Sequence, residues 1–282
     1  MRAGRSALAL LASALVFSAA VCAAETVVFP RAPLVRPLLS DPREAQSTLR
    51  YLVGSGTARG EASFGDTVWL VGGQGGRSWQ MGVQGAVYTR FNRDRDSVGF
   101  LDINSIDYTI FLPVDLSLDG VDLRFGIGHL SSHLGESEVQ RRIRYEGAMF
   151  FDRSFLYRRD FFRVLVSSDL SDAWRLYAGT SYGFHMTPDR SRTAVQAGME
   201  WKAIFHRWGL VRRQWYAGVD VQSWAEAEWA LNTAVDIGMR VSRPDETHGL
   251  RFSITGYTGR SLQRVLARDR ERYIGMGFVF ER

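Results

Sequence analysis

The sequence is poor in cysteine and proline and has no long apolar run beyond its start. Its single cysteine, Cys22, lies in the apolar N-terminal stretch, so the rest of the chain holds no disulfide and must be stable by other means. Only 7 of the 282 residues are proline, whereas 28 are glycine and 12% are aromatic, which suits long strands better than helices. After residue 24 no stretch approaches the roughly 20 apolar residues of a membrane-spanning helix, so the sequence excludes one.

The first residues have the features of a secretory signal peptide. Arg2 and Arg5 form a basic start, an apolar stretch follows, and small residues near Ala24 suit cleavage. We therefore expect residues 1–24 to be a signal peptide that exports the chain. Attachment of lipid at Cys22 is a weaker alternative, because the valine before it is bulky where a small residue normally precedes a lipidated cysteine.

The net charge of +5 does not indicate a nucleic-acid partner. The arginines are scattered rather than clustered, and an exported protein does not meet nucleic acid in the cell. Nucleic acid is therefore excluded as an expected partner.

Alternation of apolar and polar residues is the dominant pattern of the chain. In the stretch from Trp79 to Phe91, every second residue is mostly apolar, and the residues between them include glutamine, glycine and arginine. This two-residue period predicts strands with one apolar and one polar face. The pattern predicts twelve strands, at about 46–55, 62–72, 79–91, 103–117, 120–132, 158–168, 173–186, 193–206, 214–224, 228–242, 248–258 and 271–281.

These strands are too long for an ordinary soluble sheet. Most of them span about 10 to 14 residues, whereas strands of soluble proteins average about five or six. A long strand with one apolar, aromatic-capped face and one polar, glycine-containing face is typical of a transmembrane barrel with lipid outside and water inside. We expect an all-β fold, a transmembrane, outer-membrane antiparallel β-barrel of about 12 strands. The alternative is a soluble β-sandwich or lipocalin-like barrel, in which the apolar face would point inward.

The connections between the predicted strands support an outer-membrane topology. Bacterial barrels have short periplasmic turns and longer external loops. If the last strand descends to the periplasm, the short connections 118–120, 169–172 and 243–247 fall on the periplasmic side. The longer connections 92–102, 133–157 and 258–271 then fall outside, although the connection near 206–213 is long for a periplasmic turn.

The two ends of the mature chain differ from each other. Residues 25–45 show no strand alternation and are rich in proline, so we expect a periplasmic N-terminal segment that packs under or into the barrel of residues 46–282. Near the end of the last strand, Phe280 resembles the aromatic C-terminal signal that barrel-assembly machinery recognises, although Glu281 and Arg282 follow it here. The chain is therefore predicted to be located in the bacterial outer membrane, with that machinery as a partner.

A candidate reaction site lies at the end of the fifth predicted strand. His129 and Ser131 have the phase of the lipid-facing side, and residues at i and i+2 are close enough for a base to reach a nucleophile. If strands 120–132 and 158–168 pair, Asp160 lies opposite His129, where it would orient the imidazole. Ser131, His129 and Asp160 are therefore the predicted nucleophile, base and orienting residue. Alternatives for the orienting residue lie on the following loop: Glu136, Glu138 and Glu146.

Four neighbouring residues are predicted to contact a headgroup or an oxyanion. Arg158 and Arg159 supply guanidinium groups, and His133 and Glu136 lie on the predicted external loop. Two other interpretations stay open. In the first, the polar side chains lie among lipid headgroups and have no catalytic role. In the second, His129, His133 and Glu136 form a metal site, although their spacing is not that of a helical histidine pair.

The His-x-Ser pair resembles two groups of outer-membrane lipid hydrolases, the outer membrane phospholipase A family and the lipid A deacylases. Both use such a pair on the lipid-facing wall, and the phospholipase also has twelve strands. In both groups an asparagine follows the serine, whereas this sequence has Ser132 there. The resemblance therefore covers His129 and Ser131, and Asp160 rests on the expected strand pairing.

A second resemblance covers most of the mature chain. The stretches "LLSDPRE" (38–44) and "SSHLGE" (131–136) are similar to paired motifs of the bacterial domain-of-unknown-function family 1207. Membership implies an exported envelope protein and brings no activity with it.

Two functions of different class follow from these patterns. The first is a lipid hydrolase that cleaves an acyl ester of outer-leaflet lipid, with membrane lipid or lipopolysaccharide as partner. The second is a non-enzymatic barrel, either a narrow channel or a structural envelope protein. The residues imply no certain cofactor, calcium is left open, and the sequence says nothing of the oligomeric state.

Overall fold

The computed structural model describes residues 25–55, 58–75, 78–92, 102–146, 156–203, 206–208, 211–243 and 248–281. The predicted signal peptide lies outside these residues, so it stays a prediction. Within the described residues, no helix is long and apolar enough to cross a membrane.

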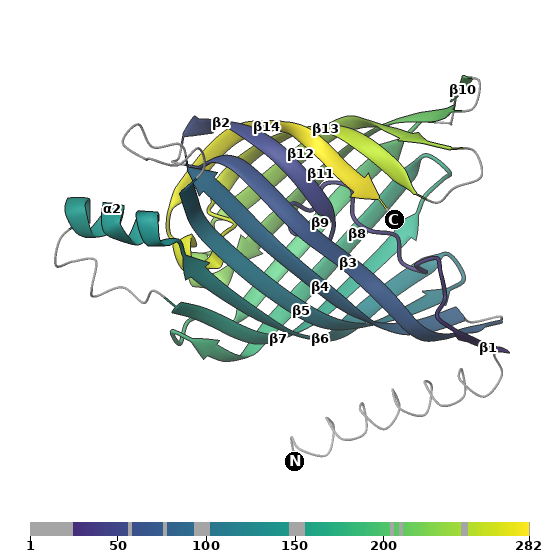
Figure 1. The fold of residues 1–282 in the computed structure, drawn as a ribbon. Coiled ribbons are helices and arrows are strands. Elements are labelled where there is room, and N and C mark those ends of the chain that lie inside the picture. The colour runs from purple at the N-terminus through teal and green to yellow at the C-terminus, as the bar shows by residue number, and fades with distance from the viewer. Residues whose placement is uncertain are drawn as a thin grey trace, which may run out of the picture.

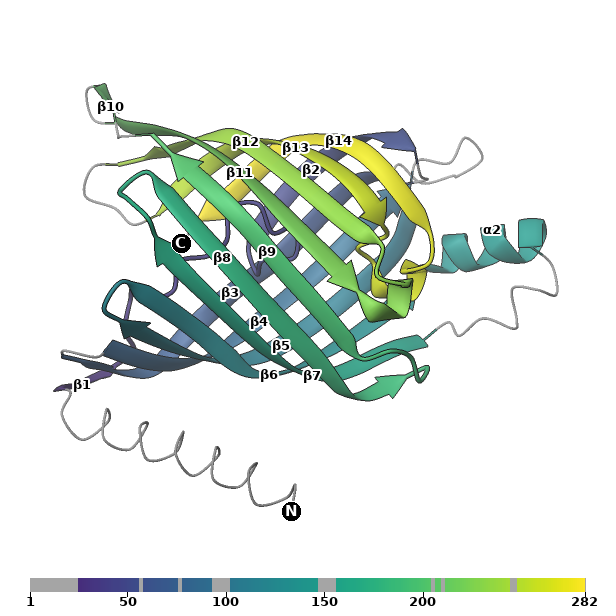
Figure 2. The same cartoon turned by 180° about the vertical axis from the view of Figure 1, so that it is seen from behind.

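Twelve long strands form a closed antiparallel barrel (Figures 1 and 2), as the sequence predicts. They are β2 Ser47–Ser55, β3 Ala58–Gln74, β4 Ser78–Asn92, β5 Asp102–Leu118, β6 Val121–Leu134, β7 Leu156–Asp169, β8 Trp174–Thr187, β9 Thr193–Lys202, β11 Val211–Trp224, β12 Leu231–Ser242, β13 Gly249–Arg260 and β14 Arg270–Glu281. Each pairs with its neighbours in the chain, and β14 pairs with β2, which closes the ring. Closure gives each of these twelve strands a partner strand on both sides, which a lipid environment requires.

Five smaller elements were not predicted. Two short strands, β1 (Glu25–Val28) and β10 (His206–Trp208), pair with β3 and β11. The predicted strand 193–206 therefore ends earlier, at Lys202. Helix α2 (Glu136–Glu146) lies within the predicted loop 133–157, and the 3₁₀ turns η2 (Ala225–Ala227) and η3 (Arg264–Leu266) lie between strands.

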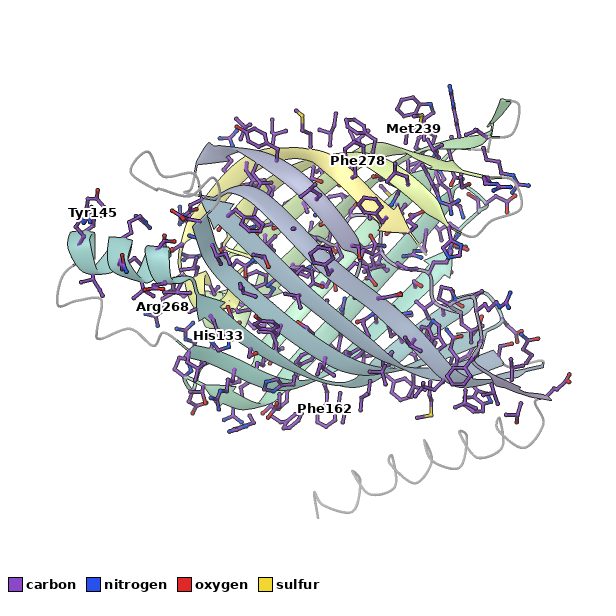
Figure 3. All side chains as sticks on the ribbon, in the orientation of Figure 1. His133, Tyr145, Phe162, Met239, Arg268 and Phe278 are labelled. Carbon is purple, nitrogen blue, oxygen red and sulfur yellow. The ribbon has the colours of Figure 1, made fainter. Side chains whose placement is uncertain are left out.

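The two faces of the barrel wall differ as a membrane barrel requires. Apolar side chains face outward, for example Phe64 (71% exposed), Leu231 (68%) and Ile274 (60%). Phe162 and Phe278 project from the wall in Figure 3. The inward face holds buried Arg90, Asp107, Asp115 and Glu200. The sandwich and lipocalin-like alternatives are therefore wrong, because the enclosed face is the polar one.

The N-terminal segment runs into the lumen of the barrel (Figure 2). Val35 and Leu38 are buried there, the backbone N–H of Val35 donates to Asp115 at 3.2 Å, and that of Leu39 donates to Glu200 at 2.6 Å. Burying these polar backbone groups costs little because wall carboxylates accept their hydrogen bonds. Residues 35–46 are called the plug below.

The end of the lumen opposite the entry of the N-terminal segment is filled by the connection that contains η3. We call this the helix end of the barrel, because α2 projects from it (Figure 1). Next to η3, Ser261, Leu262 and Gln263 are buried. Glu138 of α2 pairs with Arg142 of the same helix. Arg142 also bonds Asp269, which lies with η3 in the connection between β13 and β14, at 2.5 Å. Both ends of the lumen are therefore occupied by the chain itself.

Candidate functional site

The predicted pairing of His129 with Asp160 is present at the helix end of the outer wall. The two residues are cross-strand partners on β6 and β7. The Nδ1 atom of His129 lies 2.6 Å from Oδ1 of Asp160, within hydrogen-bond distance. Their side chains are 49% and 30% exposed, so the pair faces outward from the wall rather than into the lumen.

A second histidine, His185 of β8, bonds the other oxygen of Asp160. Its Nδ1 atom lies 2.9 Å from Oδ2 of Asp160. The register of β7 and β8 shifts between Asp160 and Phe161, and the extra residue, Phe184, is exposed beside His185. A bulge of this kind changes the face on which later residues lie. His185 is not among the predicted site residues, and strict alternation from the outward-facing Tyr182 would place it inside the barrel.

Cross-strand pairing sets a second polar row beside the first, nearer the end of the strands. Ser131 of β6, Arg158 of β7 and Thr187 of β8 are in register with one another. The Arg158 guanidinium is exposed and has no hydrogen-bond or ion-pair partner among the described residues. We call these two rows the outer-wall cluster. The first row is His129, Asp160 and His185, and the second is Ser131, Arg158 and Thr187.

The cluster lies beside apolar wall. In the next outward row toward mid-barrel, Ile127 and Phe162 are cross-strand partners and are 45% and 52% exposed. The rings of Phe162 and Phe184 lie 4.9 Å apart. Polar groups at the edge of an apolar band are typical of the level at which a barrel meets lipid headgroups. The cluster therefore lies at the edge of the apolar part of the outer wall.

The predicted nucleophile is near its base without touching it. Ser131 is half-buried on the outward side, and the described structure has no hydrogen bond between its hydroxyl and the His129 ring. Catalytic hydrogen bonds are often loose in a free enzyme and tighten when substrate binds. The structure thus brings His129 and Asp160 together. A hydrogen bond between His129 and Ser131 would require rotation of their side chains.

The four predicted contact residues separate in the structure. Arg158 faces outward, whereas Arg159 is buried on the lumen side and bonds Ser181 at 2.9 Å. Arg159 therefore cannot reach a lipid at Ser131. Neighbouring residues of a strand point to opposite faces, which explains the difference.

The other two contact residues lie beyond the cluster. His133 is exposed near the end of β6, not in a loop, and its ring meets Tyr108 edge to face at 6.1 Å. Glu136 is exposed in the first turn of α2. Among the described residues no group of three His, Cys, Asp or Glu side chains could hold a metal ion, so the structure does not support the metal site at His129, His133 and Glu136.

Ser132, the neighbour of Ser131, belongs to a separate network inside the barrel. Its hydroxyl donates to Asp107 and accepts the backbone N–H of Val265 at 2.9 Å. Arg43 of the plug pairs with the same Asp107. The backbone N–H of Arg264 in η3 also donates to it, at 3.2 Å. The motifs "DPRE" and "SSHLGE" are therefore joined through one buried carboxylate, which we call the Asp107 network.

The barrel has a closed wall, an apolar outer face and a polar lumen that the chain itself fills. Together these features define an outer-membrane-type β-barrel. The chain belongs to the family described as protein of unknown function DUF1207, whose profile matches residues 6–281. This family agrees with the resemblance of the two motifs.

Solved structures with a similar fold include two outer membrane phospholipases. The enzyme from Escherichia coli is 12% identical, with 89% of this chain and 94% of that chain covered and a TM-score of 0.51. The Salmonella typhi phospholipase, a dimer with bound calcium, is 12% identical at 86% and 93% coverage, with a TM-score of 0.50. At this identity the likeness shows the fold alone. No curated protein matches the chain.

Proposed function

We propose that this protein is an outer-membrane enzyme that hydrolyses an acyl ester of an outer-leaflet lipid. Ser131 is the nucleophile, His129 the general base and Asp160 the residue that orients the imidazole. The hydrogen bond between His129 and Asp160 on the apolar outer wall carries this proposal. A base that is held by a carboxylate and lies two residues from a hydroxyl on the same face of a strand is the arrangement that nucleophilic acyl transfer needs.

The hydrogen bond assigns a role to each ring nitrogen. An ionised Asp160 only accepts, so Nδ1 of His129 carries the hydrogen. Nε2 is then left as the acceptor for the Ser131 proton. The serine oxygen attacks the ester carbonyl, and the imidazolium returns its proton to the departing alcohol. Water then attacks the acyl-serine through the same base, which releases the fatty acid and restores Ser131.

Arg158 is placed to assist this reaction. It is exposed, lies in register with Ser131 and has no partner among the described residues. Its guanidinium suits the negative charge that develops on the carbonyl oxygen, or the phosphate of a headgroup. Lipid or lipopolysaccharide is accordingly the proposed partner, the outer membrane the proposed location, and the assembly machinery the proposed reader of the last strand.

The rival function is a non-enzymatic barrel. The lumen contains the plug and η3, with Val35 and Gln263 fully buried. A lumen filled in this way favours a structural barrel over a channel among the non-enzymatic functions. Ion conductance of planar bilayers that contain the protein would be substantial for an open channel, and we expect none above background.

Fatty-acid release from mixed phospholipid and lipid A micelles tests the enzymatic proposal. We expect release by the wild type, and its loss in Ser131→Ala and His129→Gln. Two matched variants serve as controls: Thr187→Val removes the hydroxyl on the other side of Arg158, and His248→Gln removes an exposed histidine next to β13, at the end of the barrel opposite the cluster. Both should keep their activity.

Each assay is run with calcium and with a chelator, since one similar structure is a dimer with bound calcium. Folding of every variant is checked by its heat-dependent gel mobility. Release that persists in Ser131→Ala contradicts the assignment of the nucleophile. The absence of release by the folded wild type, from every lipid tested, contradicts the enzymatic proposal for those lipids.

A further inference from the structure

Asp160 is bound on both of its oxygens by histidines from the two flanking strands. Oδ1 meets Nδ1 of His129 on β6, and Oδ2 meets Nδ1 of His185 on β8. The two contacts, at 2.6 and 2.9 Å, come from opposite sides of one carboxylate. A carboxylate held by one partner can still rotate about its terminal bonds, whereas one held at both oxygens has a fixed plane.

The backbone departs from regular pairing at the point where this contact forms. Without the shift between Asp160 and Phe161, regular alternation would pair Asp160 with Phe184 and point His185 into the lumen. The extra residue instead leaves both Phe184 and His185 exposed on the outer wall. Bulges recur beside active sites, where they redirect a side chain.

The contact has little value for stability. The His185 side chain is 73% exposed, and exposed ion pairs contribute little to the free energy of folding. A polar ring on a lipid-facing wall is itself unfavourable. A bulge that turns a histidine outward onto an exposed carboxylate therefore needs another reason, and the neighbouring His129 supplies it.

We propose that His185 is a positioning residue, which holds the Asp160 carboxylate in the plane that orients His129 for Ser131. This inference deepens the proposed hydrolase and rests on it for its catalytic meaning. The unit is one carboxylate shared by two imidazoles, His129–Asp160–His185. The two imidazoles are not equivalent in the reaction, because His129 is the base for Ser131 and His185 acts through Asp160.

Activity measurements separate this role from a general contribution to folding. Asparagine places an amide N–H close to the Nδ1 position of histidine and can still donate to Asp160. We expect His185→Ala to lower kcat by about tenfold to a hundredfold with little change in KM, since misplaced catalytic groups cost that much. His185→Asn should recover most of the loss.

A double-mutant cycle shows whether His185 acts through Asp160. If it does, His185→Ala has no further effect on kcat in a protein that already carries Asp160→Ala. Unchanged kcat in His185→Ala, or an equal loss in both backgrounds, overturns the proposal. Failure of His185→Asn to recover activity in a folded protein also counts against it.

A second measurement does not depend on activity. The histidine ring N–H signals are observed by NMR at a fixed pH in detergent micelles. Both imidazoles meet the Asp160 carboxylate through Nδ1, and an ionised carboxylate only accepts. We therefore expect a hydrogen-bonded Nδ1–H signal from His129 and another from His185 in the wild type, and the loss of both signals in Asp160→Ala.

The two measurements fail in different ways. Nδ1–H signals of His129 and His185 that persist in Asp160→Ala overturn the shared unit, whatever the activity. Both signals in a folded wild type that does not hydrolyse lipid leave the shared His129–Asp160–His185 unit standing and remove the proposed function instead.

Discussion

Ser131 and Ser132 are neighbours in the sequence and lie in two different chemical settings. Ser132 is fully buried, with its hydroxyl bonded to Asp107 and to the backbone of Val265. Ser131 faces outward and has no hydrogen-bond partner among the described residues. The hydroxyl of the inner serine is used in hydrogen bonds of the barrel interior, whereas that of the outer serine is available for the proposed reaction. One strand thus serves both architecture and proposed chemistry through its alternating faces.

The Asp107 network and the outer-wall cluster also differ in what they stabilise. The network joins the plug, the barrel wall and η3 around one carboxylate that is 0% exposed. The cluster is exposed and joins side chains of three adjacent strands. Loss of a group in the network should therefore reduce stability, and loss of Ser131, His129 or Asp160 from the cluster should reduce activity.

Removal of Asp107 should give the largest loss of stability. Asp107→Ala leaves Arg43 in the lumen without its ion pair and frees Ser132 and the backbone of Arg264. Breaking a buried pair from one side costs about 3–5 kcal/mol. The denaturant midpoint in phospholipid vesicles measures it. Asp122→Ala, at the half-buried Ser117 contact, is the matched control and should cost at most about 1.5 kcal/mol. Equal losses in the two variants would contradict the central role of Asp107.

Removal of the inner hydroxyl should have a smaller effect of the same kind. Ser132→Ala leaves a buried carboxylate and a backbone N–H each short of one partner, which costs about 1–3 kcal/mol. Ser131→Ala should stay within about 0.5 kcal/mol of the wild type, because it breaks no hydrogen bond. In fatty-acid release the order should be reversed: Ser131→Ala should lose the activity, and folded Ser132→Ala should keep most of it. A large loss of stability in Ser131→Ala would remove the distinction between the two faces.

Acidification should have the smallest effect, confined to α2. Burial alone would raise the pKa of Glu138, but hydrogen bonds from Arg141 and Arg142 outweigh it and lower the pKa below its ordinary value of 4.5. A lowered pKa gives stability that is present above pH 4.5 and is lost as the pH falls through the folded value. Hydrogen exchange should therefore show α2 intact at pH 7 and loosening once the pH falls well below 4.5. Glu138→Gln should loosen α2 already at pH 7 and remove the pH dependence; an acid transition that persists in it would assign the effect to another group.

Most of the fold could be predicted because alternation is a strong signal in long strands. The twelve strands and their two faces follow from the apolar period alone. The plug contacts could not be predicted, because residues 35–46 have no period and their partners lie far away in the sequence, as Arg43 and Asp107 do. Helix α2 was missed because its eleven residues lie within a loop that carries no apolar period.

The site was predicted as far as regular pairing extends. Pairing of β6 with β7 places Asp160 opposite His129, and the structure agrees. The role of Arg159 was assigned by nearness in sequence, and alternation puts its side chain inside. His185 was missed because the bulge at Phe184 reverses the alternation. The stretch "HMT" repeats the His-x-hydroxyl spacing of "HLS", which is the one signal that could have drawn attention to it.

Covalent labelling of the serine tests the central claim most directly. The folded protein in micelles is treated with a fluorophosphonate that carries an alkyl chain, and the modified peptide is identified by mass spectrometry. We predict one adduct, on Ser131, that is lost in Ser131→Ala, is much reduced in His129→Gln and is retained in Ser132→Ala. No adduct on Ser131, or labelling that is unchanged in His129→Gln, would contradict a serine activated by its neighbouring histidine.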